Sequence, residues 1–400
     1  MNSYLEDGKL VICLEGRISS DNSEAIAAEI DALMTEHPDR TPEFDASGLE
    51  YISSAGLRML LSIRKKAGVP LTVKNVTPEV YEIFEMTGFN FILNVKRKMR
   101  ELSVEGCEKI GEGASGTVYR LDEDTVVKVF KENISLAEIE NEREMARQAF
   151  MKGIPTAIPF DIVKVGTLYG SVFEMLKAVN CSELLVSDPE RLDEITEIYA
   201  ECLKTLHGIR MEEGRLPVIK KTYLDYLDVN ENLFSSETFA RTKALIEKIP
   251  DDLNVVHGDI QLKNFMYSDG ELILIDMDTL STGNPVFDFA GLFMTYLAFN
   301  EDEPDNTLKF TGLGKETCDE IFHKTLRQYF DTDDTELLGM IEEKISLLGY
   351  LRFLHVLTAR KVGKPELLEL RIRHALEHIE ELAPKITDLN LKADSFELLG

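Results

Sequence analysis

The sequence predicts two successive domains, an α/β domain followed by a larger α+β domain of two lobes. Strand and helix patterns alternate through residues 1–97, which is typical of α/β layer packing. β-rich segments occupy residues 109–178, and helical patterns dominate from Pro189 onward within residues 179–400. Residues 98–108 are expected to form the linker and the first strand of the second domain. A β-rich lobe followed by a helical lobe predicts a cleft between the two.

The first domain shows its elements through short apolar runs and helical periods, separated by turn residues. We expect strands at residues 9–15, near Phe44 and at 70–76, and helices at 24–34, from Ser53 onward and at 78–86. The basic stretch Lys96–Arg100 is interpreted as part of the linker, because charges at a domain junction are usually solvated. No internal repeat interrupts this pattern.

Composition and charge restrict the classes of partner. The chain carries a net charge of −28, divided into −3 for residues 1–100 and −25 for the remainder. A domain with this net negative charge should repel nucleic acid and anionic membranes. Its excess of acidic residues either favours a cationic acceptor or serves solubility alone. No apolar run is long enough to predict a membrane span, and the acidic start is unlike a secretory signal. Five scattered cysteines without a CxxC pair favour a cytoplasmic protein.

A glycine-rich segment opens the second domain and follows the pattern GxGxxGxV. The β-branched and aromatic residues after it predict that the loop closes a hairpin rather than beginning a helix. Glycines let backbone N–H groups approach phosphates closely, so we expect this loop to cover a nucleotide; an ordinary glycine hairpin is the alternative. The nucleotide-binding positions would be Gly111, Gly113, Gly116 and Val118.

A lysine lies within the next predicted strand. Lys128 follows the glycine loop, which is where a lysine that contacts α- and β-phosphates belongs. A helix is predicted over Leu136–Lys152. In it, Glu142 lies three residues after Ile139 and four before Ala146, on the apolar face. A carboxylate on an apolar face needs a partner, so we expect Glu142 to pair with Lys128 at the nucleotide site.

The strongest chemical signal is the segment His257–Asn264, with sequence HGDIQLKN. Asp259 can accept the proton of an attacking hydroxyl, and Asn264, five residues later, can bind Mg²⁺. An apolar strand then ends in Asp276-Met-Asp278. Asp276 is placed to hold Mg²⁺ between phosphate oxygens, while Asp278 is either a second metal ligand or a structural acid.

Two further polar residues are expected to support this segment. Asp288 is interpreted mainly as a structural acceptor that braces the loop, with a second metal ligand as the alternative. His257 is expected to be structural as well, because it precedes the working aspartate.

These motifs resemble the protein-kinase-like superfamily, and specifically its aminoglycoside phosphotransferase/choline kinase family. The resemblance covers about Lys109–Phe293. Gly258 stands where protein kinases have arginine, and Asp276-Met-Asp278 replaces their Asp-Phe-Gly. The segment Thr279–Val286 is short for one that docks a protein, which favours a small acceptor bearing a hydroxyl or amine group.

The resemblance implies a kinase that uses ATP and Mg²⁺. A pseudokinase would usually lack Lys128, Asp259 or Asp276, and all three are present. We therefore expect an active phosphotransferase.

The first hundred residues resemble a STAS domain, the fold of anti-sigma-factor antagonists. The residues that carry this likeness are Gly16-Arg-Ile-Ser-Ser, Asp45-Ala-Ser47, Ser53-Ser-Ala-Gly-Leu57 and Phe84-Glu-Met-Thr-Gly88. The resemblance implies phosphorylation of Ser54 at a helix start and an anti-sigma factor as partner, although Ser53 replaces the family's preceding aspartate. A phosphate there would be favoured by the helix N-terminus; the alternative is that Ser53 or Ser54 merely caps the helix.

Two functions are therefore expected. The first is transfer of the γ-phosphate of ATP to a small-molecule hydroxyl by an enzyme with a STAS regulatory domain. The alternative is a signalling protein whose kinase-like domain senses nucleotide or phosphorylates protein, including Ser54 of the same chain.

Overall fold

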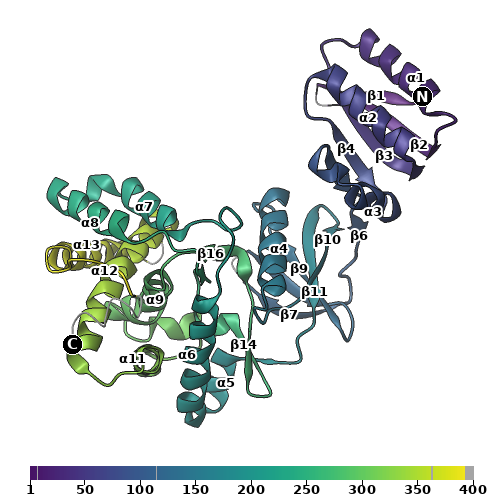
Figure 1. Ribbon diagram of the computed structural model, residues 1–400. Coiled ribbons are helices and arrows are strands. Elements are labelled where there is room, and N and C mark those ends of the chain that lie inside the picture. The colour runs from purple at the N-terminus through teal and green to yellow at the C-terminus, as the bar shows by residue number, and fades with distance from the viewer. Residues whose placement is uncertain (7, 114, 362–363, 392–400) are drawn as a thin grey trace. The chain divides into compact units, whose positions relative to one another are not determined.

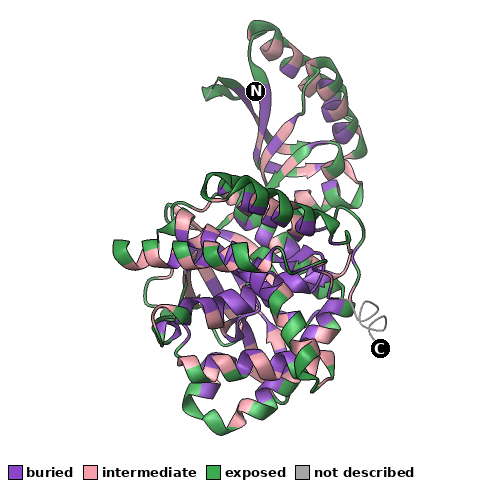
Figure 2. Cartoon of the chain, turned by 90° about the vertical axis from the view of Figure 1, so that its left-hand side faces the viewer, coloured by how far each residue is buried: buried purple, intermediate pink, exposed green. Residues whose placement is uncertain are grey.

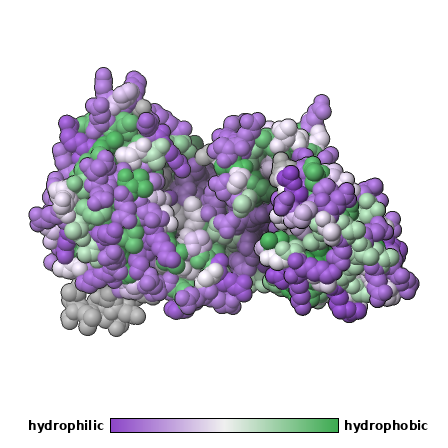
Figure 3. All heavy atoms as spheres, turned by 90° about the horizontal axis from the view of Figure 1, so that it is seen from above, coloured by the Kyte–Doolittle hydropathy of each residue, from purple (hydrophilic) through white to green (hydrophobic). Residues whose placement is uncertain are grey.

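The computed structural model describes residues 1–6, 8–113, 115–361 and 364–391. The chain divides into two compact units, Met1–Ser103 with Ile162–Tyr169, and Val104–Asp161 with Gly170–Gly400. Figure 1 shows their elements. Within the described ranges, no helix has both the length and the hydrophobicity needed to cross a bilayer. Figure 3 shows hydrophilic residues over much of the visible surface, with smaller hydrophobic patches between them.

Unit 1 is an α/β layer structure with a five-stranded sheet in the order β1-β2-β3-β4-β5. The first pair is antiparallel and the other neighbours are parallel. The strands are β1 (Ser3–Glu6), β2 (Lys9–Ile18), β3 (Thr41–Ile52), β4 (Thr72–Val76) and β5 (Asn94–Arg97), and the helices are α1 (Ser23–Glu36), α2 (Ser54–Ala67) and α3 (Pro78–Met86). A short strand β6 (Arg100–Glu101) pairs in parallel with β10 (Pro159–Val165).

The ends of α2 follow from local sequence. The hydroxyl of Ser53 accepts a hydrogen bond from Gly56 N at 3.3 Å, and Gly68 ends the helix at φ +67°. The interpretation of Lys96–Arg100 as linker needs a correction, because Lys96 and Arg97 belong to the edge strand β5, in which Arg97 pairs with Val76 of β4. The strand lacks an apolar pattern because it lies at the edge of the sheet, where most of its side chains are exposed to solvent. Its basic sequence therefore resembles that of a linker.

The first part of unit 2 is a sheet in the order β11-β9-β8-β7. The hairpin predicted around the glycine-rich segment is present as the antiparallel pair β7–β8. The elements here are β7 (Glu108–Glu112), β8 (Gly116–Arg120), β9 (Thr125–Phe130), α4 (Leu136–Met151) and β11 (Leu168–Glu174). A capping box of Ser135 and Glu138 begins α4.

The rest of unit 2 is mainly helical, as expected. A small sheet joins β12 to the antiparallel pair β14–β15, and β13 pairs with β16. The helices are α5 (Cys181–Ser187), α6 (Leu192–Gly208), α7 (Ile219–Val229), α8 (Ser236–Lys248), α9 (Val286–Phe293), α10 (Phe299–Glu301), α11 (Lys315–Phe330), α12 (Thr335–Arg360) and α13 (Pro365–Leu382); the strands are β12 (Val179–Asn180), β13 (Val255–Val256), β14 (Phe265–Ser268), β15 (Glu271–Leu274) and β16 (Ser281–Thr282).

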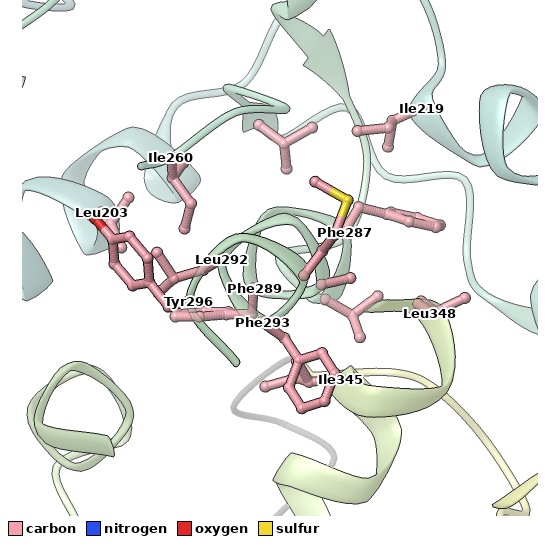
Figure 4. Close-up of a cluster of buried hydrophobic side chains, with 14 of the residues drawn as sticks. Leu203, Ile219, Ile260, Phe287, Phe289, Leu292, Phe293, Tyr296, Ile345 and Leu348 are labelled. Carbon is pink, nitrogen blue, oxygen red and sulfur yellow. The ribbon is translucent and has the colours of Figure 1, made fainter. Parts of the chain in front are cut away.

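Helix α9 lies at the centre of this helical part. All its residues are buried, and Figure 4 shows Phe287, Phe289 and Phe293 among side chains from α6, α7 and α12. Figure 2 shows that the surrounding helices keep exposed residues on their outer sides. A π-helical turn, Met294–Ala298, follows α9 directly. Because the core closes around α9, residues at its start are held firmly against the loop after β13.

Candidate active site

The loop between β13 and β14 presents Asp259. Its Oδ2 accepts hydrogen bonds from Gln261 Nε2 at 2.7 Å and from Asn264 Nδ2 at 3.1 Å. Asn264 Nδ2 also bonds to the Asp259 carbonyl oxygen at 2.9 Å. No described residue donates to Oδ1, and the Asp259 side chain is half-buried. One carboxylate oxygen is therefore held in place while the other can receive a proton.

His257 has a defined tautomer in this arrangement. Its Nε2 lies 3.1 Å from the carbonyl oxygen of Ile275, which can only accept, and its Nδ1 accepts from Asp259 N at 3.3 Å. These two contacts assign the donor role to Nε2 and the acceptor role to Nδ1. The geometry agrees with the supporting role expected for this histidine.

Asp288, near the start of α9, binds the backbone at the beginning of the loop. Its side chain is fully buried and accepts from Gly258 N at 2.6 Å and His257 N at 2.9 Å. His207 Nε2 from α6 lies 3.0 Å from the same carboxylate. Burial alone would raise the pKa of Asp288, but the hydrogen bonds from His207 and the loop hold it below its ordinary value. These contacts tie the Asp288 carboxylate to the loop backbone and to α6.

Two buried tyrosines contact the loop, and no sequence motif indicates them. Tyr199 OH from α6 donates to the Ile260 carbonyl, and Leu262 N donates to Tyr296 OH at 2.9 Å. Tyr296 lies on the π-helical turn after α9, a distortion often found near functional sites. Gln261 was not predicted either, although its position two residues after Asp259 could have indicated it.

Lys128 joins two carboxylates on opposite sides of the site. Its Nζ lies 2.8 Å from Glu142 Oε1, the pairing expected from the apolar face of α4, and 3.0 Å from Asp276 Oδ1. Burial would lower the pKa of Lys128, but the charges of Asp276 and Glu142 outweigh it and the pKa lies above its ordinary value. The lysine is thus a fixed cation between the sheet and the end of β15.

Asp276 has an unusual backbone conformation. Its φ of +64° places it in the left-handed region, which costs a non-glycine residue about 1–2 kcal/mol. The flanking structure holds it there, since Ile275 N donates to the Asn264 carbonyl at 2.9 Å and Met277 is buried. This conformation turns the Asp276 carboxylate toward Lys128.

Asp278 lies close to several other acids. Loss of hydration among neighbouring protein atoms, followed by the negative charges of Asp276 and Glu142, raises the pKa of Asp278 to about 7. This loss of hydration is partial, because part of the residue is exposed to solvent.

The residues expected to hold Mg²⁺ have suitable donor atoms. No described residue donates a hydrogen bond to Asn264 Oδ1 or to Asp276 Oδ2. Oxygen donors of this kind suit Mg²⁺, which usually takes one or two protein ligands and completes its shell with phosphates and water. Over the described part of the chain, no group of three His, Cys, Asp or Glu side chains could hold a metal alone.

The glycine-rich loop faces solvent. Gly113 N donates to the Gly116 carbonyl at 2.8 Å, and Lys131 Nζ donates to the Gly113 carbonyl at 3.2 Å. A Cβ on Gly116 would lie 2.3 Å from the Val129 carbonyl oxygen, so only glycine fits there. Gly111 and Val118 lie opposite one another on the two strands of the hairpin.

In unit 1, the two candidate serines have different positions. Ser53 is the N-cap of α2, and Ser54 is the first residue of the helix with an exposed side chain. The structure thus gives the capping role to Ser53 and leaves the Ser54 hydroxyl accessible.

Comparison with known families decides the class. A model described as the phosphotransferase enzyme family (APH) matches residues 106–321, more than half of the chain. The chain belongs to this phosphotransferase enzyme family. It is a kinase-type enzyme, and the expected fold class of its second domain is confirmed.

The N-terminal region is a STAS domain. A model described as the Mlab STAS domain matches residues 3–94. BtrV from Bordetella bronchiseptica (strain ATCC BAA-588 / NCTC 13252 / RB50), whose name describes it as a candidate anti-sigma factor antagonist, is 38% identical over 92 residues. That match covers 22% of this chain and 78% of BtrV.

Two solved structures matched by the chain have TM-scores below 0.5. An ADP-bound aminoglycoside phosphotransferase, APH(2'')-Ib, is 18% identical, with 76% of this chain and 98% of that chain covered at a TM-score of 0.47. A choline/ethanolamine kinase family protein from Mesorhizobium loti is 17% identical, with 69% and 87% covered at a TM-score of 0.43.

Proposed function

We propose that this phosphotransferase moves the γ-phosphate of ATP to a hydroxyl group of a small-molecule acceptor. The observation that carries the proposal is the meeting of Lys128, Glu142 and Asp276 in the same unit as the held carboxylate of Asp259. A fixed cation, oxygen ligands and a proton acceptor are the groups that phosphoryl transfer requires.

In this proposal each side chain has one task. Lys128 binds the α- and β-phosphates, and Glu142 keeps its ammonium in place. Mg²⁺, when bound by Asn264 and Asp276, would neutralise charge on the β- and γ-phosphate oxygens. The acceptor oxygen forms a bond to the γ-phosphorus, the bond from phosphorus to the β–γ bridging oxygen breaks, and the acceptor proton passes to Oδ1 of Asp259.

The proposed acceptor class is supported by the shortness of the segment that follows Asp276. Only residues 280–285 separate the turn Met277–Thr279 from the buried helix α9. The excess of acid in residues 101–400 supports an acceptor with cationic character.

Nucleotide titration and an acceptor screen test this function. Calorimetry with ATP and Mg²⁺ should show binding to the wild-type chain and at least about tenfold weaker binding to Lys128→Met, which loses a charge-assisted contact to phosphate. ADP formation should then rise above its water background with one class of hydroxyl compounds. Failure of the wild-type chain to bind ATP would exclude the proposal.

A second candidate function rests on Ser54. Its exposed hydroxyl at the start of α2 would place a phosphate at a helix N-terminus, where backbone N–H groups favour negative charge. Phosphorylation there would control binding of the STAS domain to a protein partner such as an anti-sigma factor. Mass spectrometry after incubation with ATP tests this, with Ser54→Ala and Asp259→Asn as controls; an unmodified Ser54 in the wild type excludes transfer within the chain.

A further inference from the structure

Arg352 on α12 contacts the catalytic loop from 94 residues away. Its Nη1 donates to the Gly258 carbonyl oxygen at 2.5 Å, and a second hydrogen bond joins it to the Tyr223 hydroxyl of α7. No carboxylate of the described residues lies within 4.0 Å of this guanidinium. Arg352 is only partly exposed. A half-buried cation that bonds to a backbone carbonyl and to no acid is unusual, because burial of charge normally demands a carboxylate partner.

The carbonyl that Arg352 holds belongs to a peptide with little freedom. Gly258 has φ +83°, and a Cβ at this residue would lie 2.7 Å from the Thr279 carbonyl oxygen. Asp288 Oδ1 holds the Gly258 N–H at 2.6 Å, and Arg352 holds its carbonyl on the other side.

The same peptide determines where Asp259 stands. The Gly258 carbonyl and the Asp259 N–H lie in one planar peptide group, so a bond to the first orients the second. That N–H points at His257 Nδ1, at 3.3 Å. Arg352 therefore acts on the backbone from which the Asp259 side chain projects.

Helix α9 leaves room for the guanidinium. A Cβ on Gly291 would lie 2.5 Å from Arg352 Nη1 and 3.5 Å from the Gly258 carbonyl oxygen. Gly291 lies in a buried helix, where alanine is normally better than glycine by about 1 kcal/mol. The glycine at this position does not favour the helix, but it leaves the space that the contact between Arg352 and the loop needs.

We propose that Arg352 is a positioning residue for the catalytic aspartate: it orients the Gly258–Asp259 peptide, and Gly291 provides the space that this contact needs. The proposal rests on the proposed function, in which Asp259 accepts the proton. It adds a residue outside the motif, on a helix far along the chain.

Two variants disturb the same contact in different ways. Arg352→Ala removes the guanidinium, whereas Gly291→Ala keeps it and pushes it from the carbonyl. We expect each to lower kcat for ADP formation about 10- to 100-fold, because displacement of a reacting group by about 1 Å can cost that much. ATP affinity should stay within about twofold, since neither residue contacts Lys128 or Asp276. Arg360→Ala, at the exposed end of the same helix, is the control and should match the wild type.

The experiment measures ADP release from ATP and Mg²⁺ by the full-length chain, with water as the phosphate acceptor. Methylguanidine should restore part of kcat to Arg352→Ala without raising its unfolding temperature, and should leave Asp259→Asn inactive. A purely structural arginine would instead lower the unfolding temperature and leave the kcat of folded protein unchanged, which would overturn the proposal.

A second readout separates this inference from the proposed function. If the wild-type chain forms no ADP with water or with any acceptor of the screen, the proposed function fails, and hydrogen exchange of the Asp259 amide then decides the positioning role. Faster exchange in Arg352→Ala and Gly291→Ala than in Arg360→Ala supports it, whereas equal exchange in all three contradicts it.

Discussion

The catalytic loop, His257–Asn264, and the glycine-rich loop, Gly111–Gly116, are held in opposite ways. Most of the catalytic loop is buried, and side chains from α6, α9, the π-helical turn and α12 bond to it. Among its described residues, Glu112 and Gly113 are exposed and Gly116 is buried, and the hydrogen bonds of the loop come from its own hairpin and from Lys131, which follows β9.

This difference shows how a phosphotransferase divides its tasks. A proton acceptor works only when its position is defined within a fraction of an ångström, so many distant elements fix Asp259. A phosphate cover must admit and release nucleotide, so local hydrogen bonds are enough. Substitutions in the first loop should therefore destabilise the chain, whereas substitutions at the exposed residues of the second should affect mainly nucleotide binding.

The largest effect on stability is expected at Asp288. Asp288→Ala removes the acceptor of two buried loop N–H groups and of His207, which should lower the free energy of unfolding by about 3–5 kcal/mol. Asp122→Ala is the matched control, because Asp122 also accepts two backbone N–H groups but in an exposed turn. Urea unfolding should show that Asp122→Ala lowers the free energy of unfolding by less than about 1 kcal/mol. Equal losses in the two variants would contradict the difference in support.

Alanine in place of glycine sharpens the comparison between the loops. Gly258→Ala would place a Cβ 2.7 Å from the Thr279 carbonyl oxygen at φ +83°, at a cost of about 1–3 kcal/mol. At Gly113 the nearest neighbour of a Cβ is 4.0 Å away, so Gly113→Ala should change stability by less than about 0.5 kcal/mol. Thermal unfolding of both variants checks this, and a larger loss at Gly113 would contradict it.

Gln261 tests how far the orientation of Asp259 matters. Gln261→Leu removes the 2.7 Å hydrogen bond to Oδ2 and should lower turnover about tenfold, since a hydrogen bond to a charged group contributes about 1.5–3 kcal/mol. Steady-state ADP formation measures this. Lys263→Gln, which alters a loop side chain without a bond to Asp259, should leave turnover unchanged.

The smallest effect is expected in acid. The pKa of Asp288 lies below its ordinary 3.8, so its stabilising bonds are complete above that pH and are lost as pH falls through the lowered pKa. Between pH 5 and pH 3 the wild type should lose more stability than Asp288→Asn, which cannot titrate. Urea midpoints at both pH values decide this, and parallel losses in the two proteins would contradict it.

Much of the site could be predicted from the sequence. Asp259 and Asn264 share one short loop, and Glu142 was separated from its neighbouring glutamates by helical periodicity. These predictions rest on spacing within one element, which sequence displays directly. The same applies to the strands and helices of unit 1, whose patterns alternate clearly, apart from the basic edge strand β5.

The supports of the loop could not be predicted in this way. Tyr199, Tyr296 and Arg352 lie 34 to 94 residues from the loop atoms that they contact. Nothing in the local pattern of a mostly apolar helix shows which polar side chain turns toward a distant backbone group. Their contacts depend on how α6, α9 and α12 pack around the core, and tertiary packing determines them.

The central claim is that Asp259, held by this frame, accepts the proton during phosphate transfer. Turnover of ATP and the affinity for ATP, measured in parallel for the wild type and Asp259→Asn, test it most directly. We predict that turnover falls by about a thousandfold, while ATP affinity remains within about twofold, because the amide keeps the shape but cannot accept the proton. Wild-type turnover in Asp259→Asn would contradict the claim.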